Sequence, residues 1–161
     1  MNKQPNSYDC FICGVKNVSG VHVEFYERRR DDGVPEIIAY FTGQENHQGY
    51  PGRMHGGVIT GILDETIGRA INIEAEDPIH PPVWGVTVEI NVQFHKPVPL
   101  DVQLSAAGRI THERERFFQG TGELLLPDGE VAATAVGKYV KLALDDIAGM
   151  DPDSLGWRVY D

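Results

Sequence analysis

The chain has 161 residues, of which 41% are hydrophobic and 24% are charged, and its formal net charge is -10. This length suits one domain with one core, spanning residues 1–161, and the composition excludes the disordered and membrane-spanning classes. The acidic balance argues against a general nucleic-acid or membrane surface, and the N-terminus lacks the apolar run of a secretory signal, so we expect a cytoplasmic protein.

Residues 1–20 are rich in turn formers, which indicates an irregular lead-in. They contain Cys10 and Cys13 in a Cys-X-X-Cys spacing. A structural zinc site normally uses four nitrogen or sulfur ligands, and the sequence has no second Cys-X-X-Cys. We therefore expect a turn built on Cys13 and Gly14, with no metal site.

Two strand candidates follow the lead-in. Residues 21–28 alternate apolar and polar side chains, which predicts a half-buried strand, and residues 35–42 form a second candidate. The charged tract between them, residues 28–33, is typical of a solvated hairpin loop. Residues 43–54 contain too many Gly, Pro, Asn and Gln residues for regular structure, and such loops often carry functional groups.

Residues 56–73 have the periodicity of a helix. At about 100° per residue one wide arc holds seven of their side chains, namely Ile59, Ile62, Leu63, Thr66, Ile67, Ala70 and Ile71. This arc is broader than a surface helix needs, so we expect the helix to be largely enclosed. Three prolines in residues 74–83 end it.

In residues 84–94 the period changes to two. One predicted face carries Val86, Val88, Ile90, Val92 and Phe94. The other carries Thr87, Glu89, Asn91 and Gln93. This alternation predicts a strand with one apolar and one polar face.

Three further strands are predicted at residues 101–110, 115–126 and 130–142, the last two joined by a turn at residues 127–129. Residues 143–161 are expected to form an irregular tail. A single helix that is apolar over most of its circumference has to be covered by the sheet, because nothing else in the chain can cover it. The predicted class is therefore α+β, with an antiparallel sheet wrapped around one long central helix.

Two acidic residues, Asp64 and Glu65, lie in the middle of the predicted helix. Asp64 shares one helical stripe with three glycines, namely Gly57, Gly61 and Gly68. Three glycines on one line indicate that a partner helix or a ligand approaches the backbone closely. Glu65 lies off the stripe, four residues before Arg69, in the spacing that favours an ion pair. Asp64 is either part of a subunit contact or polar network, or a general base or nucleophile.

His55, Gly56 and Gly57 open this helix. The first N–H groups of a helix have no internal acceptor and carry the positive end of its dipole, and glycine leaves them unobstructed. They form an anion site, which becomes an oxyanion hole when the substrate is a carbonyl compound.

Three stretches extend this pattern: HQGYPGRMHGGVITGILDETIG, VTVEINVQFHKPVPL and LLLPDGEVAATAVGKYVKL. In these stretches, and in the lead-in CFICGVKNVSG, the sequence resembles the hotdog-fold acyl-CoA thioesterases, in particular the PaaI-like branch of the 4-hydroxybenzoyl-CoA thioesterase superfamily. The resemblance spans residues 10–142. It implies a hotdog fold and hydrolysis of acyl-CoA to free acid and coenzyme A without a cofactor. It also implies composite sites in a homodimer, or in a dimer of such dimers.

The resemblance also implies roles for particular residues. Asp64 acts as base or nucleophile, facing the helix start of the other subunit, where the Gly56 N–H binds the thioester oxygen. Thr87 helps to hold the attacking water. The candidates for substrate contact are His47, Gly49, His55, Gly57 and Glu65. Some members of this family carry an asparagine where Gly49 stands here, and Asn46 or His47 could replace it.

Coenzyme A carries phosphates, which favour basic side chains. The candidates are Arg53, Lys96, Arg114 and Arg116.

Two other function classes stay open. A hotdog dehydratase or hydratase acting on hydroxyacyl thioesters would use a histidine such as His47, although His47 is further from Asp64 and Glu65 than in the dehydratase pattern. A non-catalytic acyl-CoA-binding module is the other class, and the absence of a DNA-binding segment argues against a regulator of that kind. We expect thioester hydrolysis, and neither nucleic acid nor membrane as a partner.

Overall fold

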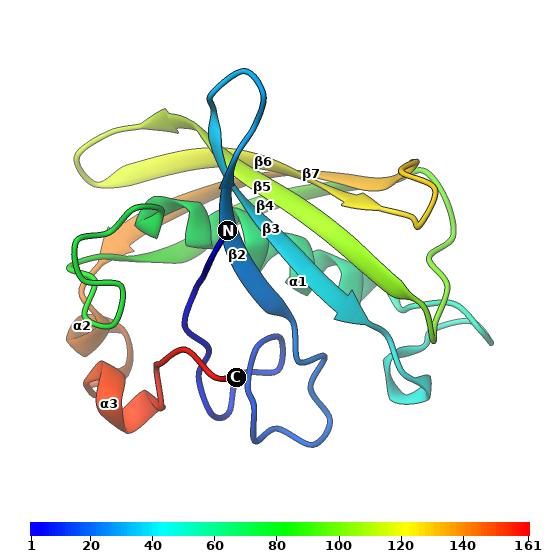
Figure 1. Cartoon of the computed structure of the whole chain (residues 1–161), viewed down its shortest axis with the longest axis horizontal. Helices are drawn as coiled ribbons and strands as arrows, with labels where there is room; N and C mark the ends of the chain where they lie inside the picture. Colours follow the sequence, from blue (N-terminus) through cyan, green and yellow to red (C-terminus); the bar gives the residue numbers. More distant parts are fainter.

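In a computed structural model that describes residues 1–161, one antiparallel sheet curves around a single long helix (Figure 1). The strand order in the sheet is β1-β2-β3-β5-β6-β7-β4. The strands are β1 (Asn2–Lys3), β2 (Glu24–Arg29), β3 (Pro35–Thr42), β4 (Trp84–Phe94), β5 (Gln103–Glu113), β6 (Phe117–Leu125) and β7 (Val131–Leu142). The helices are α1 (Gly56–Gly68), α2 (Leu144–Ala148) and α3 (Pro152–Leu155), with 3-10 turns η1 (Glu45–His47) and η2 (Arg69–Asn72). The predicted α+β class and wrapped helix are confirmed.

Helix α1 packs its apolar arc against the sheet and into the hydrophobic core. Ile62, Leu63 and Ile67 are fully buried there, and Thr66 is buried with them because its hydroxyl donates to the Ile62 carbonyl at 2.6 Å. The α-helix is shorter than predicted. It ends at Gly68, and the chain continues as η2 through Asn72.

Glycines on β5 and β6 let the sheet approach α1 closely. Gly108 and Gly122 face each other in the β5–β6 register. A Cβ on Gly108 would lie 2.9 Å from backbone atoms of Thr66 and Ile67, and one on Gly122 would lie 3.0 Å from the Ile67 side chain. The last turn of α1 therefore rests almost directly on the sheet backbone.

The two ends of the chain cover the side of α1 that faces away from the sheet (Figure 1). Ile12 approaches the glycine stripe so closely that a Cβ on Gly61 would lie 3.0 Å from its Cδ1 atom. Trp157 is buried, and its indole N–H donates to the Pro78 carbonyl at 3.0 Å. At Gly61 the close approach is therefore made by the lead-in of the same chain, whereas a partner helix or a ligand was expected. The expectation of irregular ends was incomplete, since the ends form β1, α2 and α3.

Strand β4 lies at the edge of the sheet and pairs only with β7. Its register shifts at Val88, because Thr87 lies opposite Tyr139 while Glu89 lies opposite Lys138. A bulge of this kind inserts one residue and reverses the alternation of side chains. The prediction that Thr87 and Ile90 face opposite sides was therefore wrong. Thr87 reaches α1, and Ile90 packs against the core.

The other predicted strands agree closely with the structure. β3 and β4 have the predicted bounds, and β2, β5, β6 and β7 differ from prediction by one to three residues at their ends. The predicted turns at residues 28–33 and 127–129 form with positive φ at Gly33 (83°) and Gly129 (87°), a conformation that glycine adopts without strain. None of the helices combines the length and the apolar character needed to cross a lipid bilayer.

We predict that Gly108→Ala lowers the free energy of unfolding by about 1–3 kcal/mol, because the added methyl group meets helix backbone that cannot move aside. Thr121→Ala, in the adjacent strand between two glycines, adds nothing on the helix side and is the control. Chemical denaturation of both variants measures the effect. An unchanged midpoint for Gly108→Ala would show that α1 does not lie this close to the sheet.

Candidate active site

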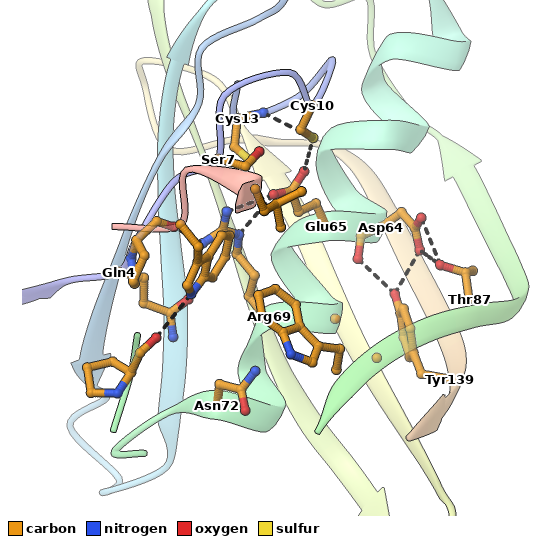
Figure 2. A pocket seen from close by; sticks show the side chains of 17 residues that line it. Gln4, Ser7, Cys10, Cys13, Asp64, Glu65, Arg69, Asn72, Thr87 and Tyr139 are labelled. Atoms are coloured by element: carbon orange, nitrogen blue, oxygen red, sulfur yellow. Dashed lines mark hydrogen bonds and ion pairs between the residues drawn. The ribbon is translucent and has the colours of Figure 1, made fainter. Parts of the chain in front are cut away.

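A cavity of about 390 Å³ lies between α1, β4, the lead-in and the C-terminal tail (Figure 2). Asp64 and Glu65 line it from α1, and Thr87 lines it from β4. Two aromatic residues, Trp84 and Trp157, form part of its wall and contact each other with ring centroids 4.7 Å apart. The cavity thus combines an apolar wall with a small set of acidic groups, which is typical of a ligand site.

The Asp64 carboxylate is held by two hydroxyl groups. Thr87 Oγ1 lies 2.8 and 3.0 Å from its two oxygens, and Tyr139 Oη donates to Oδ1 at 3.1 Å and to the Asp64 carbonyl at 2.9 Å. Tyr139 is itself fixed, because its ring is buried and stacks on Phe118 at a centroid distance of 4.8 Å. The carboxylate therefore has a defined orientation at the cavity wall.

Tyr139 was not among the functional residues predicted from the sequence. The available signal was its place on β7, two residues after Gly137, as a bulky residue in a strand rich in small side chains. Its distance from Asp64 along the chain hides the contact until the sheet is assembled.

Burial raises the pKa of Asp64 above its ordinary value, and the hydrogen bonds from Thr87 and Tyr139 oppose this shift without cancelling it. Burial and the neighbouring Asp64 charge also raise the pKa of Tyr139, so its hydroxyl stays protonated and remains a donor. Asp64 is therefore a carboxylate of increased basicity, and Tyr139 beside it always donates a hydrogen bond.

The start of α1 leaves one N–H group free. His55 is the N-cap, and its Nδ1 atom accepts the Gly57 N–H at 2.8 Å. The N–H groups of Val58 and Ile59 donate to the His55 carbonyl at 3.0 and 3.1 Å. The Gly56 N–H has no acceptor within the chain. Gly56 is therefore the available donor, whereas the Gly57 N–H is already used.

Asp64 and Gly56 do not meet within one chain. Eight residues separate them on α1, which corresponds to about 12 Å along the helix axis. A single carbonyl group cannot contact both. Any site that uses both groups has to combine two copies of the chain.

The loop residues predicted to contact substrate do not line this cavity. His47 is buried, with Nδ1 accepting a backbone N–H at 3.0 Å and Nε2 lying 2.9 Å from the Ser19 carbonyl. Asn46 donates to the same carbonyl at 3.3 Å. Gly49 lies against His55, since a Cβ there would be 3.2 Å from the His55 Cα. These residues fix the loop that leads into α1, and a side chain larger than that of Gly49 would press against His55.

Glu65 forms the ion pair that its spacing predicts. Arg69 Nε and Nη2 donate to Glu65 Oε1 at 3.0 and 2.8 Å, and Arg69 Nη1 donates to the Pro5 carbonyl at 2.7 Å. Burial raises the pKa of Glu65, although the positive charge of Arg69 opposes the shift. The second carboxylate oxygen lies 3.4 Å from Cys10 Sγ.

The four basic residues predicted as contacts for the coenzyme A phosphates fall into two groups. Arg53 and Lys96 line one shallow surface depression near the start of α1, where Lys96 also pairs with Glu130 at 2.5 Å. Arg114 and Arg116 lie together on the β5–β6 hairpin.

Comparisons with known proteins agree with this architecture. The sequence profile described as the thioesterase superfamily matches residues 51–133, just over half of the chain. This segment contains the start of α1, Asp64 and Thr87. No curated protein matches the chain in sequence.

Solved structures show the same fold. A thioesterase superfamily protein superposes with a TM-score of 0.66 at 25% identity, and the alignment covers 83% of this chain but only 63% of that protein. A Bacillus halodurans protein solved with CoA has a TM-score of 0.58 at 24% identity, with 73% of each chain covered. The Escherichia coli PaaI protein, from an operon for phenylacetic acid degradation, has a TM-score of 0.58 at 16% identity, with 67% of this chain and 73% of that chain covered.

We predict that Asp64→Asn increases the free energy of unfolding at neutral pH. The raised pKa means that the folded state favours the protonated acid, so ionisation of Asp64 destabilises the fold as the pH rises from its ordinary value of 3.8 through the raised value. The gain in the free energy of unfolding should therefore become smaller as the pH is lowered toward 3.8. Urea denaturation at several pH values measures it.

Asp77→Asn is the control, because the pKa of Asp77 is shifted in the opposite direction to that of Asp64. A hydrogen bond from His80 lowers the pKa of this exposed aspartate, so its ionised form stabilises the fold at neutral pH and its replacement should bring no gain. An Asp64→Asn variant that is less stable than wild type at neutral pH would contradict the assignment.

Proposed function

The chain belongs to the thioesterase superfamily, and from this premise we propose that it hydrolyses an acyl-CoA thioester to the free acid and coenzyme A. One observation carries the proposal. The only unpaired N–H at the start of α1 and the hydrogen-bonded Asp64 carboxylate lie about 12 Å apart on one rigid helix. In a pair of antiparallel helices, each free N–H can face the carboxylate of the other chain.

In the proposed reaction, Asp64 removes a proton from water as the water oxygen bonds to the thioester carbon. The Gly56 N–H of the other subunit stabilises the oxygen of the tetrahedral intermediate. The intermediate then breaks its carbon–sulfur bond, and the coenzyme A thiolate takes up the proton from Asp64. The raised pKa of Asp64 makes it a stronger base for the first step. Direct attack by the carboxylate, through an anhydride that water then hydrolyses, uses the same groups.

Thr87 and Tyr139 orient the carboxylate in this scheme. Both donate to Asp64 Oδ1, and Thr87 is also near Oδ2. The Thr87 side chain is exposed at the edge strand, so its hydroxyl can also contact the attacking water. Tyr139 lies deeper and acts as a positioning residue.

We further propose that two chains pair through β4. The strand is at the edge of the sheet and presents unpaired backbone groups, which are a template for pairing with another strand. Val88 and Phe94 on this strand are 59% and 54% exposed, although both are apolar. Pairing of β4 with its copy would cover them and would bring the second α1 close to the first.

Coenzyme A binding is supported by the Bacillus halodurans structure, which was solved with CoA. In this chain Arg53 and Lys96 are the preferred phosphate contacts, because their depression lies beside the start of α1. The cavity beyond Asp64 would then hold the acyl group.

The dehydratase alternative is less well supported. It needs a histidine that faces the substrate, and both ring nitrogens of His47 are engaged with backbone groups. A purely binding module would not need a carboxylate of raised pKa held by two hydroxyl groups.

We predict that Asp64→Ala lowers kcat for thiol release from acyl-CoA by about 10²- to 10⁴-fold, because the general base is lost. Free thiol released from a panel of acyl-CoA substrates measures the effect. Glu74→Gln, an exposed carboxylate in a surface ion pair with Arg29, is the control and should retain wild-type turnover. Equal turnover by the Asp64 variant and wild type would exclude the proposed chemistry.

We predict that Gly56→Pro lowers kcat by about 10²- to 10³-fold, while Gly56→Ala keeps most of the activity. Proline removes the N–H but suits the first position of a helix, and the extended backbone of His55 (φ -63°, ψ 136°) tolerates a following proline. A Cβ at position 56 meets only the Phe94 ring, at 3.5 Å. Thiol-release kinetics and circular dichroism on both variants test this pair. Similar activity in the two variants would remove Gly56 from the mechanism.

A further inference from the structure

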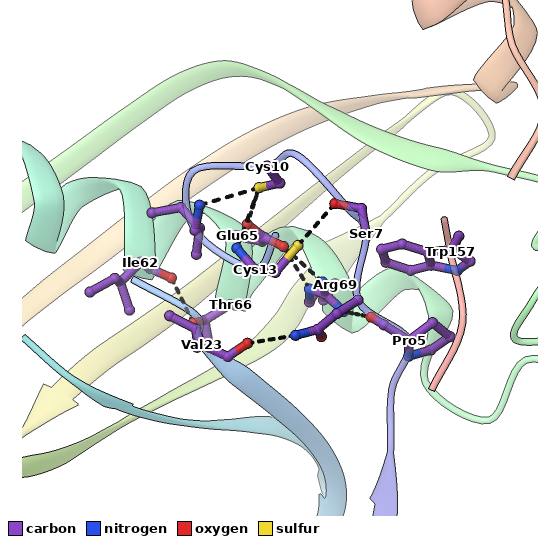
Figure 3. A network of polar contacts seen from close by, with 12 residues as sticks. Pro5, Ser7, Cys10, Cys13, Val23, Ile62, Glu65, Thr66, Arg69 and Trp157 are labelled. Atoms are coloured by element: carbon purple, nitrogen blue, oxygen red, sulfur yellow. Dashed lines mark hydrogen bonds and ion pairs between the residues drawn. The ribbon is translucent and has the colours of Figure 1, made fainter. Parts of the chain in front are cut away.

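The lead-in brings two cysteines against a carboxylate of α1 (Figure 3). The ligand atoms of Cys10, Cys13 and Glu65 all lie within 4.8 Å of one another. Cys13 is buried, while Cys10 and Glu65 are half-buried, and both cysteines are free thiols. The proposed hydrolysis assigns no chemical step to this cluster.

We propose that Cys10, Cys13 and Glu65 bind a thiophilic divalent cation, with zinc as the expected metal. Thiolate and carboxylate groups are both zinc ligands, and a site with three protein ligands keeps a fourth position for water or another ligand. The inference stands independently of thioester hydrolysis.

The distances fit a tetrahedral site. Zinc bonds of about 2.3 Å to sulfur and about 2.1 Å to oxygen place neighbouring sulfur and oxygen ligands about 3.6 Å apart. Cys10 Sγ and Glu65 Oε2 are 3.4 Å apart. Two of the three ligand atoms therefore already have the required separation, and the third lies within reach.

The turn around the cysteines presents backbone donors to sulfur. The N–H groups of Ile12 and Cys13 point to Cys10 Sγ at 3.3 and 3.5 Å. Gly14 permits this tight turn, because a Cβ there would lie 2.3 Å from the Cys10 carbonyl oxygen. Ser7 Oγ is 3.5 Å from Cys13 Sγ. Donors of this kind stabilise thiolates and orient the ligands of a metal.

Arg69 fixes the carboxylate in the orientation that a metal needs. It holds Glu65 Oε1 through two hydrogen bonds, which leaves Oε2 directed at the cysteines. Arg69 is itself held by the Pro5 carbonyl and by the Phe25 ring, 3.9 Å away. Two thiolates and one carboxylate carry three negative charges, which a divalent cation and Arg69 together balance. Metal binding would displace the thiol protons into solvent.

All three ligands line the same cavity as Asp64 (Figure 2). The fourth coordination position can therefore accept water or a group bound in the cavity. The metal would also tie the lead-in to α1, where Ile12 packs on Gly61. The metal site was not predicted from the sequence, because two cysteines alone are too few ligands for zinc and Glu65 lies far from them along the chain.

Cobalt provides a direct test on the untagged chain of residues 1–161. The apo protein, prepared with a chelator, is titrated with Co²⁺ under reducing conditions. We expect thiolate-to-cobalt charge-transfer absorption that saturates at about one Co²⁺ per chain and is abolished when Zn²⁺ displaces it. Metal analysis of protein purified without chelator should likewise give about one zinc per chain.

Loss of a residue that only supports a metal ligand typically weakens metal binding 10- to 100-fold. We expect at least this loss of Co²⁺ affinity when a direct ligand is replaced, in Cys10→Ser, Cys13→Ser and Glu65→Gln. His80→Ala removes an exposed histidine that contacts Asp77 and Asp153, a group that could bind metal adventitiously, and should leave the affinity unchanged. The wild-type spectrum is decisive even if a variant fails to fold, since the chain has only two cysteines. No charge-transfer band at excess Co²⁺, or binding that is lost in His80→Ala and kept in the cysteine variants, would overturn the proposal.

Discussion

The rigid length of α1 is the constraint on which the proposed site depends. The helix places a free N–H at its start and a hydroxyl-bound carboxylate in its middle, about 12 Å apart. Both groups belong to the same continuous α-helix, so no movement of the helix relative to the sheet can bring them together. Catalysis by both groups therefore requires a second chain, and the exposed edge strand β4 is the surface that can recruit it.

Much of the fold could be predicted from the sequence because the side-chain pattern repeats with the period of each element. Helix α1 and strands β3 and β4 were found in this way. The bulge at Val88 was missed because it shifts the pattern by one residue, and apolar and polar residues continue to alternate on both sides of it. The short elements β1, α2 and α3 were missed because elements of two to five residues are too short to show a period, and β1 forms only by pairing with β2.

The candidate site was predictable only where its residues are close in sequence. Helical spacing gave the Glu65–Arg69 ion pair, and helix-start chemistry gave Gly56. Tyr139 and the cysteines could not be placed, because they reach α1 only after β7 and the lead-in have packed against it. The N-capping role of His55 was also hidden. It distinguishes the occupied N–H of Gly57 from the free N–H of Gly56.

The most direct test of the central claim is activity in mixed dimers of an Asp64→Asn chain and a Gly56→Pro chain. Each variant alone lacks one required group in every site. In a mixed dimer, one site combines the intact Gly56 of the first chain with the intact Asp64 of the second. Co-refolding at equal amounts should therefore restore about a quarter of wild-type thioesterase activity, since half of the dimers are mixed and each has one complete site. If dimers form and the mixture is no more active than the separate variants, the two groups do not act across a subunit interface.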